Sequence, residues 1–229
     1  MTADPTPLRG LVVDWGGVLT ADVGSAMAAW CEADGIAYDE FRRVMGSWLG
    51  PAAAEEARWN PVHALERGEI EVPDFEHRLA TALRRDDGSG PPAEGLLERM
   101  FARFEHAPDM AGLVRRAHEA GLRTAVLSNS WGNPYPRDGW AEMFDAVVIS
   151  GEVGMRKPEP RIYHHVLDLL DLPASTCVFV DDLPANVEAA VGVGMVGVVH
   201  RNYEETAGEL AGLFGLDLHD GDEPGRPAS

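Results

Sequence analysis

Four short motifs of the chain carry carboxylate, hydroxyl or ammonium side chains that could take part in a reaction. VVDWGGVLT carries Asp14, VLSNS carries Ser128, GMRKPEP carries Lys157, and VFVDDLPANVEAA carries Asp181 and Asp182. Three of these motifs follow short apolar runs, which read as buried strands. Polar residues at the carboxyl ends of parallel strands collect at one edge of the sheet, where ligands bind. A carboxylate, a hydroxyl, an ammonium group and an acidic pair at one edge would suit chemistry on a phosphoryl group beside a divalent cation.

The first two motifs offer a nucleophile and a hydrogen-bond donor. Asp14 could attack phosphorus, and the glycines at 16 and 17 would let backbone N–H groups approach a phosphate closely. Ser128 could donate to a phosphoryl oxygen. Each residue also has a simpler interpretation on its own, since Asp and Ser are both common in the turns that follow strands.

The other two motifs offer a cation and a metal site. Lys157 is the only lysine beside 18 arginines, which indicates a place that needs a compact point charge, although a surface lysine would satisfy the same count. Asp181 and Asp182 are adjacent carboxylates, and such a pair is costly unless a cation compensates it. Mg²⁺ suits carboxylate and carbonyl ligands. An N-cap role for Asp182 would explain only one of the two residues.

The elements that would position these motifs alternate between strand and helix. Apolar runs predict strands at 8–15, 122–129, 144–150, 176–182 and 195–200, and helical patterns at 108–121, 159–172 and 184–194 separate the later ones. This alternation predicts an α/β fold, a doubly wound parallel sheet with helices on both faces.

A long helical stretch interrupts this pattern after the first strand. Amphipathic patterns predict helices at 24–34, 38–49, 74–85 and 93–105, and the stretch is too long for a loop. We therefore predict an α/β core made of residues 1–20 and 107–215, a helical domain at 21–106, and a disordered tail at 216–229. The core of the helical domain is expected to hold Trp30, Trp48 and Trp59.

The composition limits the partners of the protein. Its 229 residues are 45% hydrophobic, and its formal charge is 19 − 38 = −19, which disfavours nucleic acid as a partner. No apolar run is long enough for a membrane span, and the first residues lack a signal pattern. Cys31 and Cys177 are expected to be buried thiols in a reducing compartment. We expect a cytoplasmic protein without a membrane partner, and the sequence gives no indication of oligomeric state.

With its motifs in this order, the chain resembles the haloacid dehalogenase superfamily over residues 8 to 213. The helical stretch is similar to the cap domain that this superfamily carries at the position called C1. Within the superfamily, VGMRKPEPRIY and FVDDLPANVEAA most resemble the N-terminal phosphatase domain of soluble epoxide hydrolases, and ALERGEIEVPDFEHRL at 64–79 has the look of the same group. The resemblance implies a Rossmann-like core and hydrolase activity.

The resemblance also implies a role for each motif. Asp14 would be the nucleophile that becomes an aspartyl-phosphate, and Lys157 would keep it ionised and bind the phosphoryl group with Ser128. A Mg²⁺ cofactor would be held by Asp14, the Gly16 carbonyl and Asp182, with Asp181 beside it. The residues implied on the substrate side are Trp15, Gly16, Ser128 and Asn129. Asn186 lies where many relatives have a second acidic or polar residue of the last motif.

One position departs from the pattern of the superfamily. Relatives that hydrolyse phosphomonoesters carry an Asp two residues after the nucleophile, where this chain has Gly16. Positioned acid/base groups contribute about 10²–10⁴-fold in rate. Two functions therefore stay open, a Mg²⁺-dependent hydrolase of a small phosphorylated substrate with impaired turnover, and a weak or inactive relative that binds a phosphorylated ligand or partner.

Other branches of the superfamily also lack this Asp. Phosphonatases use a cap lysine as a Schiff base, but no lysine lies between residues 21 and 106. Haloacid dehalogenases need no metal, which leaves Asp181 and Asp182 unexplained. Phosphotransferases of the ATPase type tolerate the loss because their leaving group needs little protonation.

Overall fold

The computed structural model of the protein describes residues 7–49, 59–133 and 135–218. Of the predicted tail at 216–229, residues 219–229 lie outside the described part. Its strands are β1 (Gly10–Val13), β2 (Arg123–Ser128), β3 (Ala146–Ile149), β4 (Cys177–Asp181) and β5 (Val196–Val199). Its helices are α1 (Val23–Asp34), α2 (Tyr38–Leu49), α4 (Pro61–Glu66), α5 (Val72–Ala82), α6 (Leu96–Phe101), α7 (Pro108–Glu119), α8 (Ser150–Val153), α9 (Pro160–Leu170), α10 (Pro184–Gly192) and α11 (Tyr203–Phe214), with 3-10 turns η1 (Trp140–Glu142) and η2 (Ala174–Thr176).

The five strands form one parallel sheet in the order β3-β2-β1-β4-β5. All four residues of β1 are buried, because this strand is central and covered on both faces. Its last residue, Val13, pairs with Val126 of β2 and with Val180 of β4. The predicted doubly wound α/β fold is confirmed, and the first, second and fourth motifs leave the sheet at one edge.

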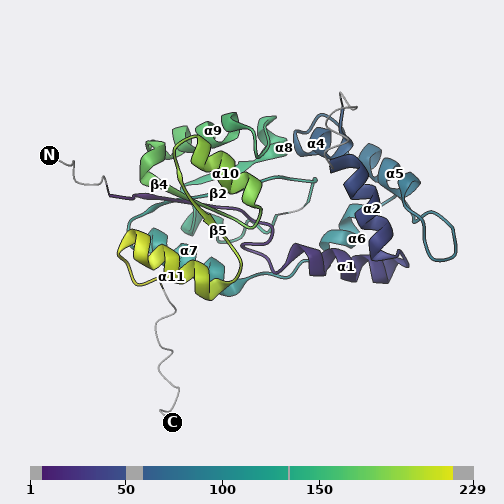
Figure 1. Ribbon diagram of the computed structural model, residues 1–229, viewed down its shortest axis with the longest axis horizontal. Coiled ribbons are helices and arrows are strands. Elements are labelled where there is room, and N and C mark those ends of the chain that lie inside the picture. The colour runs from purple at the N-terminus through teal and green to yellow at the C-terminus, as the bar shows by residue number, and fades with distance from the viewer. Residues whose placement is uncertain (1–6, 50–58, 134, 219–229) are drawn as a thin grey trace, which may run out of the picture.

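Helices cover both faces of the sheet (Figure 1). α9 packs on β2 and β3, and α10 packs on β4 and β5, while α7 and α11 lie together on the opposite face. Two apolar clusters fill the layers, one around Leu113 and Val180 and the other around Tyr163 and Phe179. The helix α11, which the sequence patterns did not predict, begins at the cap residue Asn202, whose side chain accepts from the Glu205 N–H.

The helices α1, α2, α4, α5 and α6 gather beside the sheet as a separate group with an apolar cluster of its own (Figure 1). Trp30 is fully buried in that cluster, and Trp48 packs edge-on against Phe75 with ring centroids 5.9 Å apart. The expectation for Trp59 was wrong, because its side chain is 44% exposed. Instead, the Arg78 guanidinium lies 4.8 Å from the centroid of the Trp59 ring.

An antiparallel bridge pairs Thr20 with His106 where the chain passes between the core and this helical group. The two crossings are therefore side by side, close to the boundaries predicted at 21 and 106. Both cysteines are buried, Cys31 in the helical group and Cys177 in the core. None of the described helices combines the length and apolarity needed to cross a bilayer.

Candidate functional site

Asp14 lies directly after β1 and is buried, with 7% of its surface exposed. Its backbone N–H donates to the Val180 carbonyl at 2.9 Å, which continues the pairing of β1 with β4 by one residue. The Trp15 N–H donates to Oδ1 of Asp14 at 2.7 Å. Among the described residues, every hydrogen bond and ion pair of this carboxylate goes to Oδ1, so Oδ2 has no protein partner.

The Lys157 ammonium group lies between two carboxylates at this edge. Its Nζ is 2.8 Å from Oδ1 of Asp14 and 2.6 Å from Oδ2 of Asp181, and the residue is only 1% exposed. Burial opposes the charge on Lys157, but Asp14 and Asp181 outweigh it and raise the pKa of the lysine. The unusual single lysine of the sequence is thus a fully buried cation in contact with Asp14.

The contacts of Asp14 within the protein do not bring its pKa down to the ordinary value. Burial raises the pKa of Asp14 to about 7; Lys157 opposes the rise, and Asp181 and Asp182 add to it. Lys157 therefore lowers the pKa of Asp14, as expected, but burial and the neighbouring carboxylates raise this pKa by more. A further cation at this place would return the pKa of Asp14 toward its ordinary value.

Asp181 and Asp182 have different surroundings although they are adjacent. Asp181 is fully buried, and its carboxylate accepts from the Leu183 N–H at 2.9 Å and from the Asn186 amide at 3.0 and 3.1 Å, in addition to its contact with Lys157. Asp182 is partly exposed, and burial together with Asp181 raises its pKa to about 6. Asp181 therefore organises the loop, while Asp182 keeps its carboxylate toward the cleft.

The backbone at Gly17 makes room for Asp182. Gly17 has φ +73°, and a Cβ at this position would overlap the Asp182 carboxylate. A side chain at residue 17 would be strained by the backbone conformation and would also displace the acidic group. The second glycine of the first motif is thus required by close approach to the fourth motif.

The donor set at this edge fits a divalent cation. Asp14, Asp181 and Asp182 each offer an oxygen, and these oxygens all lie within 4.8 Å of one another. The pKa values of Asp14 and Asp182 are both raised, in part by repulsion among the three carboxylates. A hard cation relieves such repulsion and prefers oxygen ligands. The site thus has the charge and the ligand type for Mg²⁺.

Ser128 and Trp15 lie close to Asp14 but are held by a residue that the sequence analysis did not assign. The Ser128 Oγ is 3.0 Å from the Tyr135 hydroxyl, and the Tyr135 ring meets Trp15 edge-on at 4.9 Å. Trp15 also stacks on Phe104, with centroids 5.9 Å apart. Tyr135 lies in the loop SWGNPYPRDGW at 130–140, and no strand or helix pattern in this loop could place its hydroxyl beside Ser128.

Asn129 connects the VLSNS motif with the GMRKPEP motif. Its Oδ1 accepts from the Lys157 N–H at 2.8 Å, and its Nδ2 donates to the Lys157 carbonyl at 3.0 Å. The carboxamide thus occupies both backbone polar groups of Lys157. The substrate-binding role implied for Asn129 stays a prediction, and in this structure its side chain fixes the lysine segment.

Gly16 lies beside open space. It has no positive φ, and a Cβ at this position would lie 3.7 Å from Cγ2 of Val23, an ordinary contact distance. A side chain at position 16 is therefore compatible with the local backbone. The absence of a carboxylate here is a property of the sequence and is not imposed by the fold.

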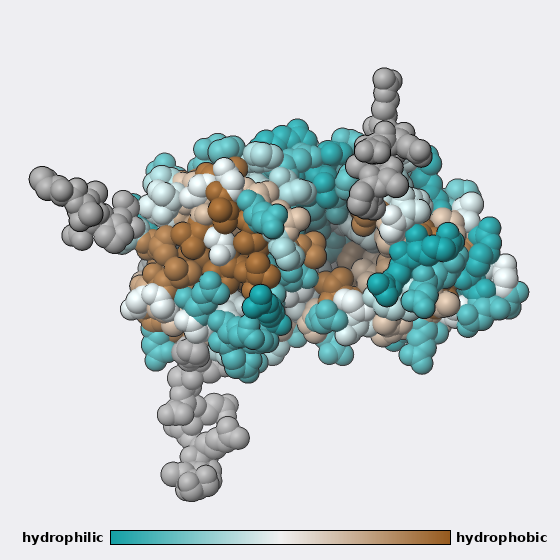
Figure 2. All heavy atoms as spheres, in the orientation of Figure 1, coloured by the Kyte–Doolittle hydropathy of each residue, from teal (hydrophilic) through white to brown (hydrophobic). Residues whose placement is uncertain are grey.

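A cavity of about 470 Å³ opens above Asp14 between the core and the helical group. Figure 2 shows the molecule hollowed between these two parts, with apolar residues in the hollow. The core side of the cavity includes the predicted residues Asp14, Trp15, Gly16, Ser128, Asn129, Lys157 and Asp182. The opposite side is largely apolar and includes Met27, Leu49, Val62, Phe101 and Phe104. The residues predicted from separate motifs, with Asp181 behind Lys157, therefore meet at one cavity.

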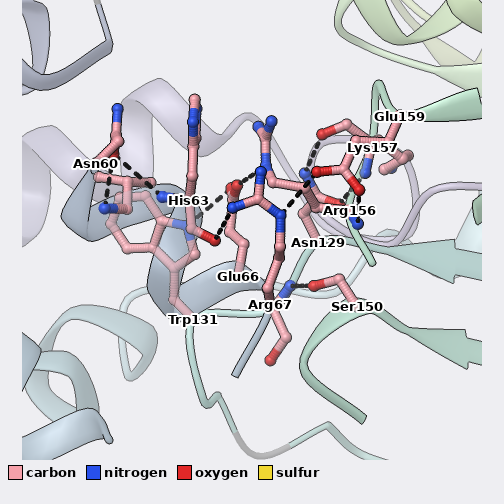
Figure 3. Close-up of polar contacts among 12 residues, drawn as sticks. Asn60, His63, Glu66, Arg67, Asn129, Trp131, Ser150, Arg156, Lys157 and Glu159 are labelled. Atoms are coloured by element: carbon pink, nitrogen blue, oxygen red, sulfur yellow. Dashed lines mark hydrogen bonds and ion pairs between the residues drawn. The ribbon is translucent and has the colours of Figure 1, made fainter. Parts of the chain in front are cut away.

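Two more charged residues line the cavity and were not singled out in the sequence. Glu66, at the end of α4, forms an ion pair with Arg156, and Oε1 of Glu66 accepts from the Trp131 indole N–H at 3.2 Å (Figure 3). Arg156 directly precedes Lys157 in the chain. No local pattern identifies this contact, because it forms only when the helical group lies against the core.

Comparison with known proteins gives matches across most of the chain. A family model for haloacid dehalogenase-like hydrolases matches residues 8–194. Bifunctional epoxide hydrolase 2 of Mus musculus is 33% identical over 69% of this chain and 31% of its own length. Sesquiterpene phosphatase astK of Aspergillus oryzae is 33% identical over 66% of this chain and 77% of its own length. The chain thus spans less than a third of the length of some curated relatives that it matches.

Among solved structures, an enzyme of this family from Bacteroides thetaiotaomicron, in complex with magnesium and inorganic phosphate, aligns with a TM-score of 0.62. It is 17% identical, and the alignment covers 85% of this chain and 94% of the other. At that identity the likeness supports the fold of the chain.

Proposed function

Because the chain belongs to the haloacid dehalogenase-like hydrolase family, we propose that it is a Mg²⁺-dependent phosphatase that acts on a small organic phosphomonoester through Asp14. The observation that carries this proposal is the contact between the buried Lys157 ammonium and Asp14 Oδ1 at 2.8 Å, while Oδ2 of Asp14 has no hydrogen bond or ion pair to the residues that the structure describes. An oriented carboxylate with one free oxygen at the floor of a cleft suits nucleophilic attack on phosphorus.

In the first half of the proposed reaction, Oδ2 of Asp14 attacks phosphorus. The bond from phosphorus to the ester oxygen breaks, and its electron pair leaves with that oxygen, which takes a proton to become an alcohol. In the second half, water attacks the phosphorus of the aspartyl-phosphate and loses a proton. The bond to Asp14 breaks, the carboxylate is regenerated, and inorganic phosphate leaves.

Besides Asp14, two residues of the chain would act on the phosphoryl group during these steps. Lys157 holds Oδ1 of Asp14 and places a fixed positive charge beside the reacting oxygens. Ser128 offers a hydroxyl, whose orientation is limited by Tyr135 at 3.0 Å. The charge and the hydroxyl are pre-organised in a partly dry cleft, where electrostatic stabilisation is larger than in water.

Mg²⁺ would be held by Asp14, Asp182 and the Gly16 carbonyl, with Asp181 behind them. When bound, it would neutralise charge on the phosphoryl oxygens. The clustering of the three carboxylates supports this assignment, and the magnesium and phosphate bound by the Bacteroides thetaiotaomicron relative agree with it.

Gly16 gives the proposed enzyme a particular chemical preference. With no carboxylate at this position, the leaving oxygen and the attacking water lose the positioned acid/base group that relatives have there, unless the cap supplies another. Aryl esters and other esters with good leaving groups would react, while alkyl esters would react slowly.

The cleft favours a substrate with an apolar body. The wall opposite Asp14 carries Met27, Val62, Phe101 and Phe104, which can bury hydrocarbon at about 25 cal/mol per Å². The match to a sesquiterpene phosphatase points in the same direction. We therefore propose a phosphomonoester of an apolar alcohol or phenol as the substrate class.

Gly16 also favours a second candidate function. A site with nucleophile, cation and clamp but no acid/base group could bind a phosphorylated ligand and release it unchanged. Steady-state hydrolysis of an aryl phosphate with and without Mg²⁺ separates the two functions, with Asp14→Asn as the control. Mg²⁺-dependent turnover that is lost in Asp14→Asn supports the phosphatase, and vanadate binding without turnover supports the binding protein.

A further inference from the structure

Glu66 is a buried carboxylate on the cap side whose polar partners come from the core. Its side chain is 9% exposed, and among the described residues its hydrogen bonds go to Trp131 and Arg156. A buried carboxylate is costly unless it is paired and hydrogen-bonded. Each carboxylate oxygen of Glu66 has one of these partners, so the cost is met only while the cap helix α4 lies against the core.

The two partners of Glu66 belong to the two loops that carry the phosphate-binding residues. Trp131 follows Ser128 and Asn129 in the chain, and its ring packs on Phe75 of α5 with centroids 5.6 Å apart. Arg156 directly precedes Lys157. The cap is therefore attached to the core next to Ser128 on one side and next to Lys157 on the other.

The same two loops are tied to each other on the core side. Asn129 hydrogen-bonds both the N–H and the carbonyl of Lys157. A closed ring results, made of the hydrogen bonds of Glu66 to Trp131 and Arg156, those of Asn129 to Lys157, and the chain segments 129–131 and 156–157 (Figure 3). Glu66, Trp131, Asn129, Arg156 and Lys157 all line the cavity above Asp14.

We propose that Glu66 is a positioning residue of the proposed phosphatase. Through its bonds to Trp131 and Arg156, it holds Ser128 and Lys157 in the geometry for phosphoryl transfer. The inference rests on the proposed function of Asp14. Its physical basis is that small displacements of groups around a reacting centre lower the rate strongly, about 100-fold per ångström in sensitive cases. The cap would then contribute to the chemistry itself as well as to substrate selection.

A second ion pair between the cap and the core supplies a matched control. Arg67, the residue after α4, pairs with Glu159 at 2.7 Å, and both side chains are about a quarter exposed. Neither residue lines the cavity. Arg67→Met removes this pair but leaves Glu159 its contact with Arg161 at 2.7 Å. Glu69, 3.7 Å from Arg67, also loses that contact, but its side chain is half exposed, so water can replace the lost partner. Arg67→Met therefore measures how a weaker contact between the cap and the core affects kcat while Glu66 is unchanged.

The test compares wild type, Glu66→Gln and Arg67→Met by aryl phosphate turnover, by binding of vanadate and inorganic phosphate, and by melting temperature, all with Mg²⁺. In Glu66→Gln we expect kcat and vanadate affinity to fall by about tenfold or more, while KM and phosphate affinity change by less than about threefold. Vanadate mimics the transition state, so it should follow kcat. Arg67→Met should lower the melting temperature and leave kcat unchanged.

Trp131→Phe provides a second route if Glu66→Gln does not fold. It keeps an aromatic ring beside Phe75 but removes the indole N–H together with part of the ring, and a smaller loss of kcat with unchanged phosphate affinity is expected. If kcat in Glu66→Gln equals kcat in Arg67→Met, the positioning role is overturned and the proposed phosphatase still stands. If only Trp131→Phe folds, the same comparison is made between Trp131→Phe and Arg67→Met. A wild type that binds neither anion would overturn both.

Discussion

The Nζ atom of Lys157 lies 2.8 Å from Oδ1 of Asp14, although 157 − 14 = 143 positions separate the two residues in the sequence. The lysine segment is fixed by Asn129, and the Asp14 segment is fixed by its pairing with β4. The only lysine of the chain therefore has one position and two carboxylate partners. This arrangement makes Asp14, the proposed nucleophile, dependent on Lys157 for orientation and for compensation of its charge.

Replacement of Lys157 by alanine should remove activity and weaken the metal-free protein. Removing one partner of a buried ion pair costs about 3–5 kcal/mol, and Asp14 and Asp181 would both lose their cation. We expect kcat to fall at least about 100-fold and the melting temperature without Mg²⁺ to fall. Lys157→Arg should rescue poorly, because the planar guanidinium needs a different volume. Vanadate affinity like that of wild type in Lys157→Ala would rule out the role in phosphoryl binding.

Magnesium should stabilise the wild type more than it stabilises Asp182→Asn. The ion relieves repulsion among Asp14, Asp181 and Asp182, and a ligand that binds only the folded state raises its stability by mass action. The melting temperature is measured in chelator and at increasing Mg²⁺ for both proteins. Equal shifts would remove Asp182 from the metal site.

The stability of the metal-free protein should fall as pH rises from about 4 to about 7. The folded-state pKa values of Asp14 and Asp182 are raised to about 7 and about 6, from an ordinary value of 3.8. In that interval the folded state binds more protons than the unfolded state, so the free energy of unfolding decreases with pH. The decrease should be smaller in Asp182→Asn, and saturating Mg²⁺ should reduce it in wild type. An equal pH dependence in both proteins, with or without Mg²⁺, would contradict the raised pKa values.

Substitution of Gly16 by aspartate should increase the hydrolysis of alkyl phosphates. Gly16 has no positive φ, and its Cβ would have an ordinary contact with Val23, so the variant should fold. We expect a gain of at least about tenfold in kcat/KM for an alkyl ester and a smaller gain for an aryl ester, because only the alkyl leaving group depends strongly on protonation.

Gly17→Ala is the steric contrast to Gly16→Ala. Alanine at 17 would be strained at φ +73° and would displace Asp182, whereas alanine at 16 has space. Only Gly17→Ala should lose the Mg²⁺-dependent rise in melting temperature.

For Gly16→Asp, a different outcome would contradict the prediction. If this variant folds, binds Mg²⁺ and vanadate, and hydrolyses neither ester faster than wild type, the missing carboxylate is not what limits turnover.

Much of this site could be predicted from the sequence because local patterns determine it. Parallel strands bring their carboxyl ends to one edge, so Asp14, Ser128 and Asp181 had to meet once the strands were recognised. The different surroundings of Asp181 and Asp182 could not be predicted, because they depend on which carboxylate points toward Lys157.

Two contacts of the site had no signal in the sequence. The Tyr135 hydroxyl beside Ser128 depends on how an irregular loop packs, and the contact of Glu66 with Arg156 depends on how the cap docks. Trp59 was misplaced for a related reason, since an aromatic residue can cover a surface through an arginine as well as fill a core.

The most direct test of the account is to find the phosphoryl group on the protein during turnover. Wild-type protein is mixed with an aryl phosphate and Mg²⁺, quenched in acid and digested, and the peptides are examined by mass spectrometry. The account predicts one phosphorylated peptide, the one that contains Asp14, and its absence in Asp14→Asn together with loss of hydrolysis. Turnover that persists in Asp14→Asn, or a phosphoryl group on another residue, would contradict the assignment of Asp14 as the nucleophile.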